Sequence, residues 1–429
     1  MPAGTRPVGM RKGLYFEATR PERLKAAWRH VRQNGLISPS AETQEAVAQF
    51  DFEADRRLER LYRQLLHRHF TFKPGKGVLK RREGKSPRPI VVHQLEDRIV
   101  QRSILSVLQL HPRVNQYVRV PTSFGGIEGP SVRLALNATI DRIRGGASSF
   151  VRSDIKDFFG GIPKEAVLDL LGKMIDDPDF LGFVTSAITV ELENLGTLGR
   201  DAELFPIYEV GVAQGCALSP LFGNILLHDF DLQLNARGLH CLRYVDDFLL
   251  LGPSDRHVRQ GFKSALRILE THSLSAYDPW RREAKASKGR VEDGFEFLGC
   301  EVSPDRILPG RKARARLRKK VRGALDESTK AFRLADPKAL ERANLVTTLK
   351  KVSNIIQGWG NQYSFCNSPR LWRKLDRDID ALIIAYLGKY KTARGAFLRR
   401  QDAPMLGRRF LGVHLLEDSK SSPILQKLQ

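Results

Sequence analysis

The spacing of apolar residues divides this chain into helical ends and a strand-rich middle. In residues 14–70 apolar positions recur every three or four residues, as in Leu24, Trp28 and Val31, which predicts amphipathic helices. From residue 72 to 303 short runs of β-forming residues alternate with helical patterns. After residue 311 helical spacing returns, with one apolar stripe from Leu345 to Trp359. The pattern predicts an α+β protein whose sheet lies in the middle of the sequence.

The stretch His240–Gly252 is the most informative part of the pattern. Its sequence, HCLRYVDDFLLLG, places two apolar runs around the adjacent carboxylates Asp246 and Asp247. This arrangement predicts a β-hairpin with the two carboxylates at or near its tip. Neighbouring anions repel each other, so a divalent cation with oxygen ligands would compensate them. An ordinary Asp-containing turn is the alternative.

A second acidic residue ends a predicted buried strand. Phe150–Ile155 is apolar enough for such a strand, with Asp154 near its end, and helical spacing follows from Val167. An anion on an apolar strand is costly unless it is paired or bound to a metal. Asp154 is therefore a second candidate metal ligand, or else a residue that stops a strand or caps a helix. Further on, Ser219-Pro220 predicts a helix start with Ser219 as its cap.

Residues 72–101 are punctuated by Gly and Pro and predict a short hairpin. Its cations surround a Gly-containing turn and comprise Lys80, Arg81, Arg82, Lys85 and Arg88. Such a hairpin can contact a triphosphate or a nucleic-acid backbone. A basic surface loop is the alternative. Residues 175–207 contain no recognisable motif.

The overall charge indicates a polyanionic partner. The 429 residues contain 71 Lys and Arg against 48 Asp and Glu, a formal net charge of +23. The segment 311–322, RKARARLRKKVR, has eight cations in twelve positions and could follow a duplex backbone, although a solvated helix is the alternative. No run is long enough to span a bilayer, the first residues lack a signal peptide, and no CxxC pair occurs. We therefore expect a cytoplasmic protein without membrane partners.

Six blocks occur in one order along the chain: RPIVV…DRIVQ, SFGG, DIKDFF, AQGCALSP…N, YVDD and FLG. Together they resemble the reverse transcriptases of the bacterial group II intron-like lineage. The resemblance runs from about Phe72 to Gly299 and implies a right-hand polymerase fold. The implied domains are a helical extension (1–71), fingers (72–148), an antiparallel-sheet palm with the catalytic hairpin (149–303), a helical thumb (304–395) and a basic tail (396–429).

The resemblance also implies the chemistry of the site. The reaction is in-line attack of a 3′-hydroxyl on the α-phosphate of a nucleotide, assisted by two Mg²⁺ ions about 3.5–4 Å apart, for which Mn²⁺ is a possible substitute. Asp154 and Asp246 would hold both ions, with Asp247 as the third carboxylate and the Ile155 carbonyl as a further ligand.

Other roles follow from position within the six blocks, and further candidates are basic residues outside them: Lys80 or Arg81, Lys285 or Lys288, Arg314 and Arg318. Nucleotide contacts are expected from Arg88, Lys80 or Arg81, Asp157, Phe158, Phe159 and Gln214. Phe159 would exclude a 2′-hydroxyl and so favour deoxynucleotides. Primer and template contacts are expected from Tyr244, Val245, Lys285 or Lys288, Arg314 and Arg318.

The chain also departs from the intron-encoded pattern. Little more than thirty residues follow the predicted thumb, and they contain no Cys/His cluster. This content is similar to that of defence-associated bacterial reverse transcriptases, which implies a dedicated structured non-coding RNA as template and an antiviral role. Two alternatives remain open at this point: a maturase or RNA-binding scaffold that retains only the fold, and an RNA-templated RNA polymerase.

Overall fold

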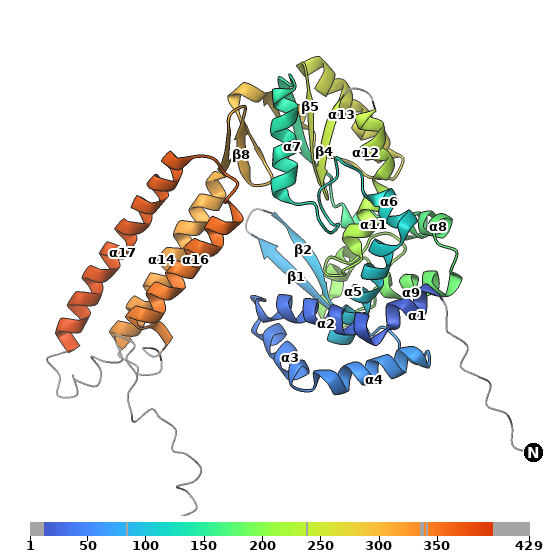
Figure 1. Ribbon diagram of the computed structural model, residues 1–429, viewed down its shortest axis with the longest axis horizontal. Coiled ribbons are helices and arrows are strands. Elements are labelled where there is room, and N and C mark those ends of the chain that lie inside the picture. Colours follow the sequence, from blue (N-terminus) through green and yellow to red (C-terminus); the bar gives the residue numbers. More distant parts are fainter. Residues whose placement is uncertain (1–12, 83–84, 237–238, 335–338, 340–341, 398–429) are drawn as a thin grey trace, which may run out of the picture. The chain divides into compact units, whose positions relative to one another are not determined.

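A computed structural model describes residues 13–82, 85–236, 239–334, 339 and 342–397. The chain forms two compact units, with the division between Val291 and Glu292 (Figure 1). Each unit is described here by itself. The predicted basic tail (396–429) lies almost wholly outside the described residues.

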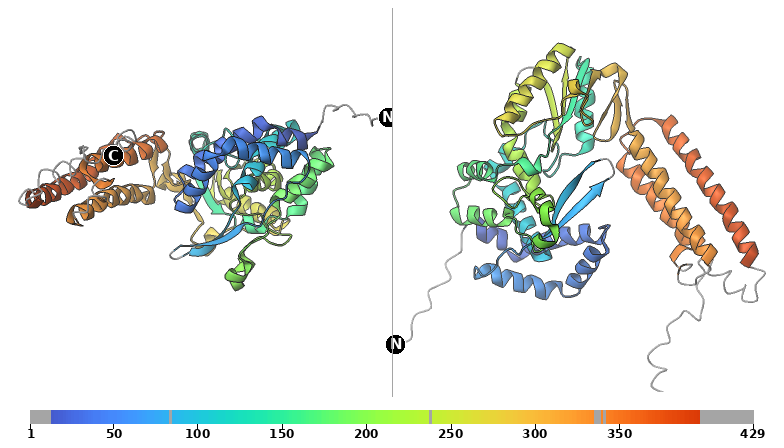
Figure 2. Two further views of the ribbon diagram at one scale, coloured as in Figure 1. Left: turned by 90° about the horizontal axis from the view of Figure 1, so that it is seen from below. Right: turned by 180° about the vertical axis from the view of Figure 1, so that it is seen from behind.

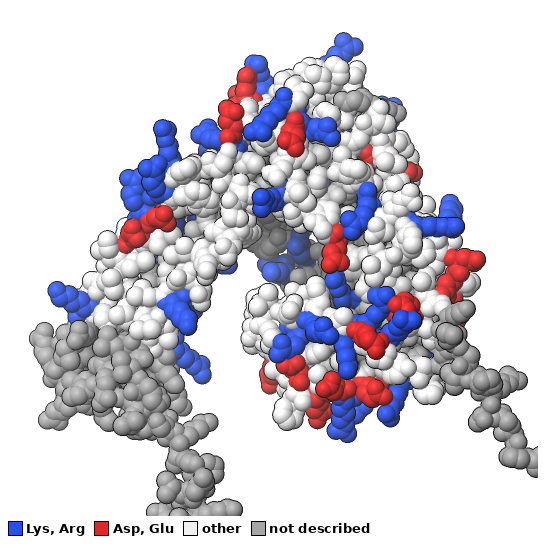
Figure 3. All heavy atoms as spheres, viewed as in Figure 1, with Lys and Arg blue, Asp and Glu red and all other residues white. Residues whose placement is uncertain are grey.

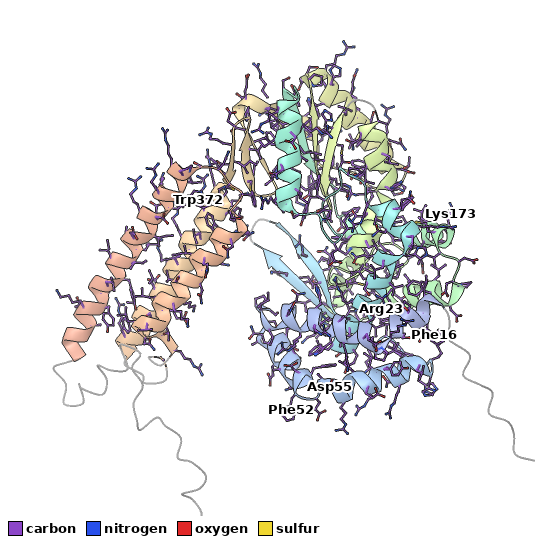
Figure 4. The ribbon with its side chains drawn as sticks, viewed as in Figure 1. Phe16, Arg23, Phe52, Asp55, Lys173 and Trp372 are labelled. Carbon is purple, nitrogen blue, oxygen red and sulfur yellow. The ribbon has the colours of Figure 1, made fainter. Side chains whose placement is uncertain are left out.

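The first unit begins with four helices, as the apolar spacing of residues 14–70 predicts. They are α1 (Leu14–Thr19), α2 (Pro21–Leu36), α3 (Ala41–Phe52) and α4 (Ala54–Leu66). Helices α1 and α2 pack on α5 (Leu95–Leu110), burying Leu24, Trp28 and Val31. Arg23 of α2 adds polar contacts, because its guanidinium donates to Glu17 and to the Ser106 hydroxyl of α5 (Figure 4). These helices therefore form a layer on the fingers region.

The predicted basic hairpin is present and longer than expected. Strand β1 (Lys76–Arg82) pairs antiparallel with β2 (Lys85–Val92), with Lys80 opposite Arg88. The two strands form a separate ribbon that projects from the helices (Figures 1 and 2). After α5 come α6 (Pro112–Val118) and α7 (Val132–Arg144).

A four-stranded antiparallel sheet forms the centre of the first unit. Its order is β4-β5-β3-β6, from the strands β3 (Ser149–Asp154), β4 (His240–Tyr244), β5 (Asp247–Gly252) and β6 (Ser287–Arg290). Phe248 to Leu251 are fully buried, which explains the continuous apolar run of β5. Helix α13 (Asp255–Glu270) packs on β3 and β5, and α7 and α12 (His228–Asn235) pack on β4 (Figure 1).

Short helices connect these strands. They are η1 (Phe159–Gly161), α8 (Lys164–Met174), α9 (Pro178–Ile188), α10 (Leu195–Leu198), η2 (Gly199–Leu204), α11 (Ser219–Leu226), η3 (Pro279–Arg281) and η4 (Val291–Asp293). One prediction is wrong in detail: Ser219 does not cap α11. Its buried hydroxyl instead donates to the Ala213 carbonyl, which fixes the loop before the helix.

The second unit combines a small sheet with long helices. Strands β7 (Phe295–Phe297), β8 (Cys300–Ser303) and β9 (Arg306–Pro309) precede α14 (Arg311–Leu334), α16 (Leu345–Gln362) and α17 (Pro369–Phe397). Val321, Phe332 and Tyr386 belong to the core between these helices. The unit begins at Glu292, so β7 and β8 belong with the helices, whereas the predicted palm extended to residue 303.

Two general features complete the fold. All four cysteines, Cys216, Cys241, Cys300 and Cys366, are free thiols and are buried. Among the described helices, none combines the length and the apolar composition that crossing a bilayer requires.

Candidate active site

The two acidic segments of the sequence meet at one end of the central sheet. Asp154, the last residue of β3, lies directly opposite Asp247, the first residue of β5. Directly opposite residues of an antiparallel pair project from the same face of the sheet. Asp246 comes directly before Asp247, in the two-residue turn Val245–Asp246 between β4 and β5. The predicted hairpin is thus confirmed, and all three carboxylates belong to adjacent strand ends.

The turn that carries Asp246 has a constrained backbone. Val245 has a φ of 61°, a conformation that is costly for a β-branched residue and that two-residue hairpin turns require. The Asp246 carbonyl accepts a hydrogen bond of 2.9 Å from the Ile155 N–H, which ties the turn to the end of β3. A Cβ at Gly125, in the SFGG block, would lie 2.7 Å from the Val245 side chain. Glycine there permits the loop to support the turn.

A buried arginine holds the same turn from inside. Arg243 of β4 is fully buried and makes a two-pronged ion pair with Asp231 of α12, at 2.8 and 2.6 Å. It also donates to the Val245 carbonyl at 2.9 Å, to the Asn224 side chain at 3.0 Å and to the Ser123 hydroxyl at 2.8 Å. One guanidinium therefore joins the SFGG block, α11, α12 and the turn, and all of its partners lie on separate elements.

Cations offset two of the three carboxylates. The Lys285 ammonium lies 2.8 Å from Asp154, and the Arg152 guanidinium lies 3.1 Å from Asp247. Burial raises the pKa of Asp247 to about 6, although Arg152 opposes the shift and the neighbouring carboxylates add to it. Burial, and then the Asp154 charge, also raise the pKa of Asp246. The charges of neighbouring carboxylates therefore add to burial in disfavouring the ionisation of Asp246 and of Asp247.

A cavity of about 580 Å³ opens beside this turn. Several predicted site residues line it: Arg88, Asp157, Phe158, Phe159, Gln214, Asp246 and Lys285. They come from the β1–β2 hairpin, called the fingers hairpin below, from the segment after β3, from the loop before α11, from the β4–β5 turn and from the loop before β6. The cavity therefore brings together residues from three of the six sequence blocks with a carboxylate of a fourth.

The aromatic pair after β3 divides between core and cavity. Phe158 is buried and packs so closely on Gly223 that a Cβ there would lie 2.6 Å from its ring. Phe159 is half-buried, and its ring lies 5.4 Å from that of Phe158. Asp157, with a φ of 41°, turns the chain at this point, and burial raises its pKa. Phe159 is thus the one of the pair that remains partly accessible.

The remaining predicted residues fall into two groups. Lys80 is exposed opposite Arg88 on the hairpin, Tyr244 is the last residue of β4, and Val245 is the first residue of the turn that contains Asp246. In the second unit Arg314 is paired with Glu301 at 2.7 Å, and Arg318 is paired with Asp378 at 2.6 Å.

Helix α14 also carries cations that face solvent. They include Arg316, Lys319, Lys320 and Arg322, all exposed. On the face drawn in Figure 3, Lys and Arg side chains also crowd the beginning of α17. The exposed cations are better placed than Arg314 and Arg318 to reach an external polyanion.

A divalent cation requires several oxygen ligands that converge on one point. In the described part of the chain, no group of three or more His, Cys, Asp or Glu side chains is arranged to hold a metal ion. Asp247 instead directs an oxygen to Arg152. Asp154 and Asp246 are hard oxygen donors on neighbouring segments, because the Asp246 carbonyl accepts from the N–H of Ile155, the residue after Asp154. Their oxygens suit a Mg²⁺-type cation, and Asp154 is ion-paired to Lys285 just as Asp247 is ion-paired to Arg152.

Sequence reasoning missed several residues that shape this site. Arg152 pairs with Asp247, and Arg243 with its partners Asp231 and Asn224 supports the turn that carries Asp246, although none of the four lines the cavity. Arg243 was detectable, because a cation inside the apolar run of His240–Gly252 requires a buried anionic partner. Its partner was not, since many acidic residues lie within range along the sequence.

Comparisons with known proteins agree with this geometry. A family profile described as "Reverse transcriptase (RNA-dependent DNA polymerase)" matches residues 74–302. The group II intron-encoded protein LtrA of Lactococcus lactis subsp. cremoris is 25% identical over 219 residues, which are 51% of this chain and 34% of that protein. The "Uncharacterized 91 kDa protein in cob intron" of Schizosaccharomyces pombe is 28% identical over 176 residues, 41% of this chain and 20% of that protein. The chain thus spans a third or less of these two relatives.

A solved structure of apo telomerase from Candida tropicalis, truncated from its C-terminal domain, is also similar. The likeness has a TM-score of 0.39 and 16% sequence identity, and it covers 54% of this chain and 53% of that one. The α+β class, the right-hand polymerase fold and the resemblance to the group II intron-like lineage are confirmed by the family match together with the antiparallel sheet.

Proposed function

We propose, from the premise that the chain belongs to the reverse transcriptase (RNA-dependent DNA polymerase) family, that it copies RNA into DNA by nucleotidyl transfer. The observation that carries the proposal is the meeting of Asp154, Asp246 and Asp247 at one sheet end, beside a cavity that also holds Arg88 and Phe159. This reaction requires carboxylates that bind divalent cations, a positively charged side chain that binds the triphosphate, and an aromatic side chain that packs against the sugar.

Each part has a residue in this chain. Asp154 and Asp246, with the Ile155 carbonyl, would hold the divalent ions, which when bound activate the attacking 3′-hydroxyl and stabilise the leaving pyrophosphate. Arg88 would bind the triphosphate, with Lys80 beside it, and the backbone amides of Asp157 and Phe158 would add to that contact. Phe159 would lie against the sugar and exclude a 2′-hydroxyl, and Gln214 would contact the base pair.

Further residues would position the two nucleic-acid strands. Tyr244 and Val245 come directly before Asp246 and would contact the primer end. Lys285, ion-paired to Asp154, lies at the same edge of the cavity. The exposed cations of α14 would neutralise phosphates of the template–product duplex, which makes binding weaker as salt rises.

Primer extension on an RNA template tests the proposal. The purified chain with Mg²⁺ or Mn²⁺ and dNTPs should extend a primer, and chelation should stop it. Asp246→Asn should lower the rate about 10³-fold, because a lost metal ligand costs several kcal/mol of transition-state stabilisation. Asp176→Asn, an exposed change outside the site, is the matched control. Full activity of Asp246→Asn would refute the mechanism, and preferential use of rNTPs would favour RNA synthesis instead.

The biological setting is the finer part of the proposal. We place the activity in anti-phage defence, with a dedicated structured non-coding RNA as template, on the strength of the sequence resemblance. Sequencing the RNA and cDNA that purify with the chain from its host would identify the template. A phage challenge with Asp246→Asn would link protection to DNA synthesis. A single recurrent RNA together with loss of protection is the expected result.

A further inference from the structure

The segment Val190–Asn194, which follows α9 and carries no recognised motif, lies along the outer edge of β1. The Gly75 N–H donates to the Glu191 carbonyl at 2.8 Å, and the Glu193 N–H donates to the Gly75 carbonyl at 3.0 Å. Two residues further along, at Gly77, the partner is the Asn194 side chain instead of the backbone. It accepts from the Gly77 N–H at 2.8 Å and donates to the Gly77 carbonyl at 2.9 Å. The segment therefore occupies the place of a neighbouring strand.

The other edge of the hairpin is held at the same level. Gly77 lies opposite Val91 of β2, and the Val91 N–H donates to the Gln214 carbonyl at 2.9 Å. The approach is close, since a Cβ at Gly215 would lie 2.3 Å from the Val91 carbonyl oxygen, and Gly215 has a φ of 128°. Asn194, Gly77, Val91 and Gln214 thus form one continuous row across the base of the fingers hairpin.

This row connects directly to the nucleotide cavity. Gln214 lines the cavity, and Arg88, three residues from Val91 on β2, lines it as well, together with Asp246. Leu198 and Phe205, on either side of η2, also lie against Gly77, since a Cβ there would be 2.7 Å from Leu198 and 3.2 Å from Phe205. The position of β1 against the palm therefore fixes where the β2 cation stands relative to Asp246.

We infer that Asn194 is a positioning residue for nucleotide binding: by clamping Gly77 it sets where Arg88 meets the triphosphate. The inference rests on the proposed function and deepens it. Asn194 does not line the cavity, so it acts through β1 and β2. Its loss should weaken capture of the incoming nucleotide and leave the carboxylate chemistry intact.

Steady-state kinetics of Asn194→Ala test the inference. Loss of two hydrogen bonds to a buried backbone should raise KM for dNTP about tenfold. The kcat and the Kd for the primed template should stay within about twofold of the parent values, because Asp154 and Asp246 are untouched. Ser186→Ala, which removes one exposed hydrogen bond within α9, is the matched control.

A steric variant reaches the same contact from the other side. A Cβ at Gly77 would lie 2.7 Å from Leu198 and 3.2 Å from Phe205, so Gly77→Ala should push β1 away and raise KM for dNTP. Adding Leu198→Ala makes room and should restore much of the parent KM. Rescue by this truncation would show that the contact between residue 77 and Leu198 is what changes KM. This pair also serves if Asn194→Ala fails to fold.

Hydrogen exchange gives a readout that does not depend on catalysis. The Gly77 amide should exchange faster in Asn194→Ala than in the parent, because Asn194 is its acceptor. DNA synthesis by the parent is established first, since its absence refutes the proposed function and with it this role of Asn194. Synthesis with an unchanged KM in Asn194→Ala and Gly77→Ala, or a fall in kcat alone, refutes only the role of Asn194.

Discussion

The palm hairpin and the fingers hairpin face the same cavity but are held in opposite ways. The β4–β5 hairpin is buried along its strands and closed by a two-residue turn, with a charged network beneath it. The β1–β2 hairpin carries exposed Lys80 and Arg88 and is held by the row through Gly77 and Val91 at its base. The first hairpin is thus buried along its strands, whereas the hydrogen bonds through Gly77 and Val91 hold the second at its base.

The difference corresponds to what each hairpin must contact. Carboxylates that share a cation have to be placed within a fraction of an ångström, and buried, fully hydrogen-bonded partners provide that precision. A cation that meets a diffusing triphosphate needs a defined base and an accessible side chain. Substitutions in the palm hairpin should therefore change stability and rate, whereas those in the fingers hairpin should change nucleotide affinity.

The largest effect is expected from Arg243→Met. It leaves Asp231 buried without a partner, so the free energy of unfolding should fall by about 3–5 kcal/mol. Urea denaturation of the full chain measures it. Adding Asp231→Leu removes the unpaired charge and should recover part of the loss, whereas exposed Arg142→Met should change stability by less than about 0.5 kcal/mol. A loss below about 1 kcal/mol for Arg243→Met would contradict the claim that the buried Arg243–Asp231 pair holds the β4–β5 hairpin in place.

The next effect is expected from Arg88→Ala. Charge-assisted hydrogen bonds are worth about 1.5–3 kcal/mol, so KM for dNTP should rise about 10- to 100-fold. The free energy of unfolding should stay constant because Arg88 is exposed. Arg88→Lys keeps the charge without the planar guanidinium, so its KM for dNTP should lie between those of the parent and of Arg88→Ala. A lower free energy of unfolding with an unchanged KM would show that Arg88 serves the stability of the fingers hairpin and not nucleotide binding.

The smallest effect concerns the foot of the fingers hairpin. Asp97 of α5 is buried, accepts a hydrogen bond from the Lys73 N–H just before β1, and has its pKa raised by burial from 3.8 to about 6. A carboxyl whose pKa is higher in the folded state stabilises the fold less as pH rises through that range. Between pH 4 and 7, Asp97→Asn should therefore gain stability relative to the parent by about 1–2 kcal/mol. Denaturation of both proteins at pH 4 and at pH 7 measures this gain. The same difference in the free energy of unfolding at both pH values would contradict the prediction.

The sequence predicted the elements whose patterns are local. The His240–Gly252 hairpin, the strand ending at Asp154 and the N-terminal helices follow from apolar spacing, and each is confirmed. The contacts that tune the site could not be predicted in this way. Arg243 and Asp231 lie on different elements, and the Asn194 clamp spans 117 residues of sequence. Such pairings depend on where the fold brings side chains together, and residues 175–207 offered no pattern that indicates it.

The burial of every native thiol has a practical consequence. Cys216 borders the cavity, yet its pKa is raised to about 11, so little thiolate exists at neutral pH. A Val78→Cys change on the exposed face of the fingers hairpin would then supply a single fast-reacting anchor for a maleimide fluorophore. Nucleotide capture and template loading could be followed by light, in real time, without first stripping the chain of its own sulfur.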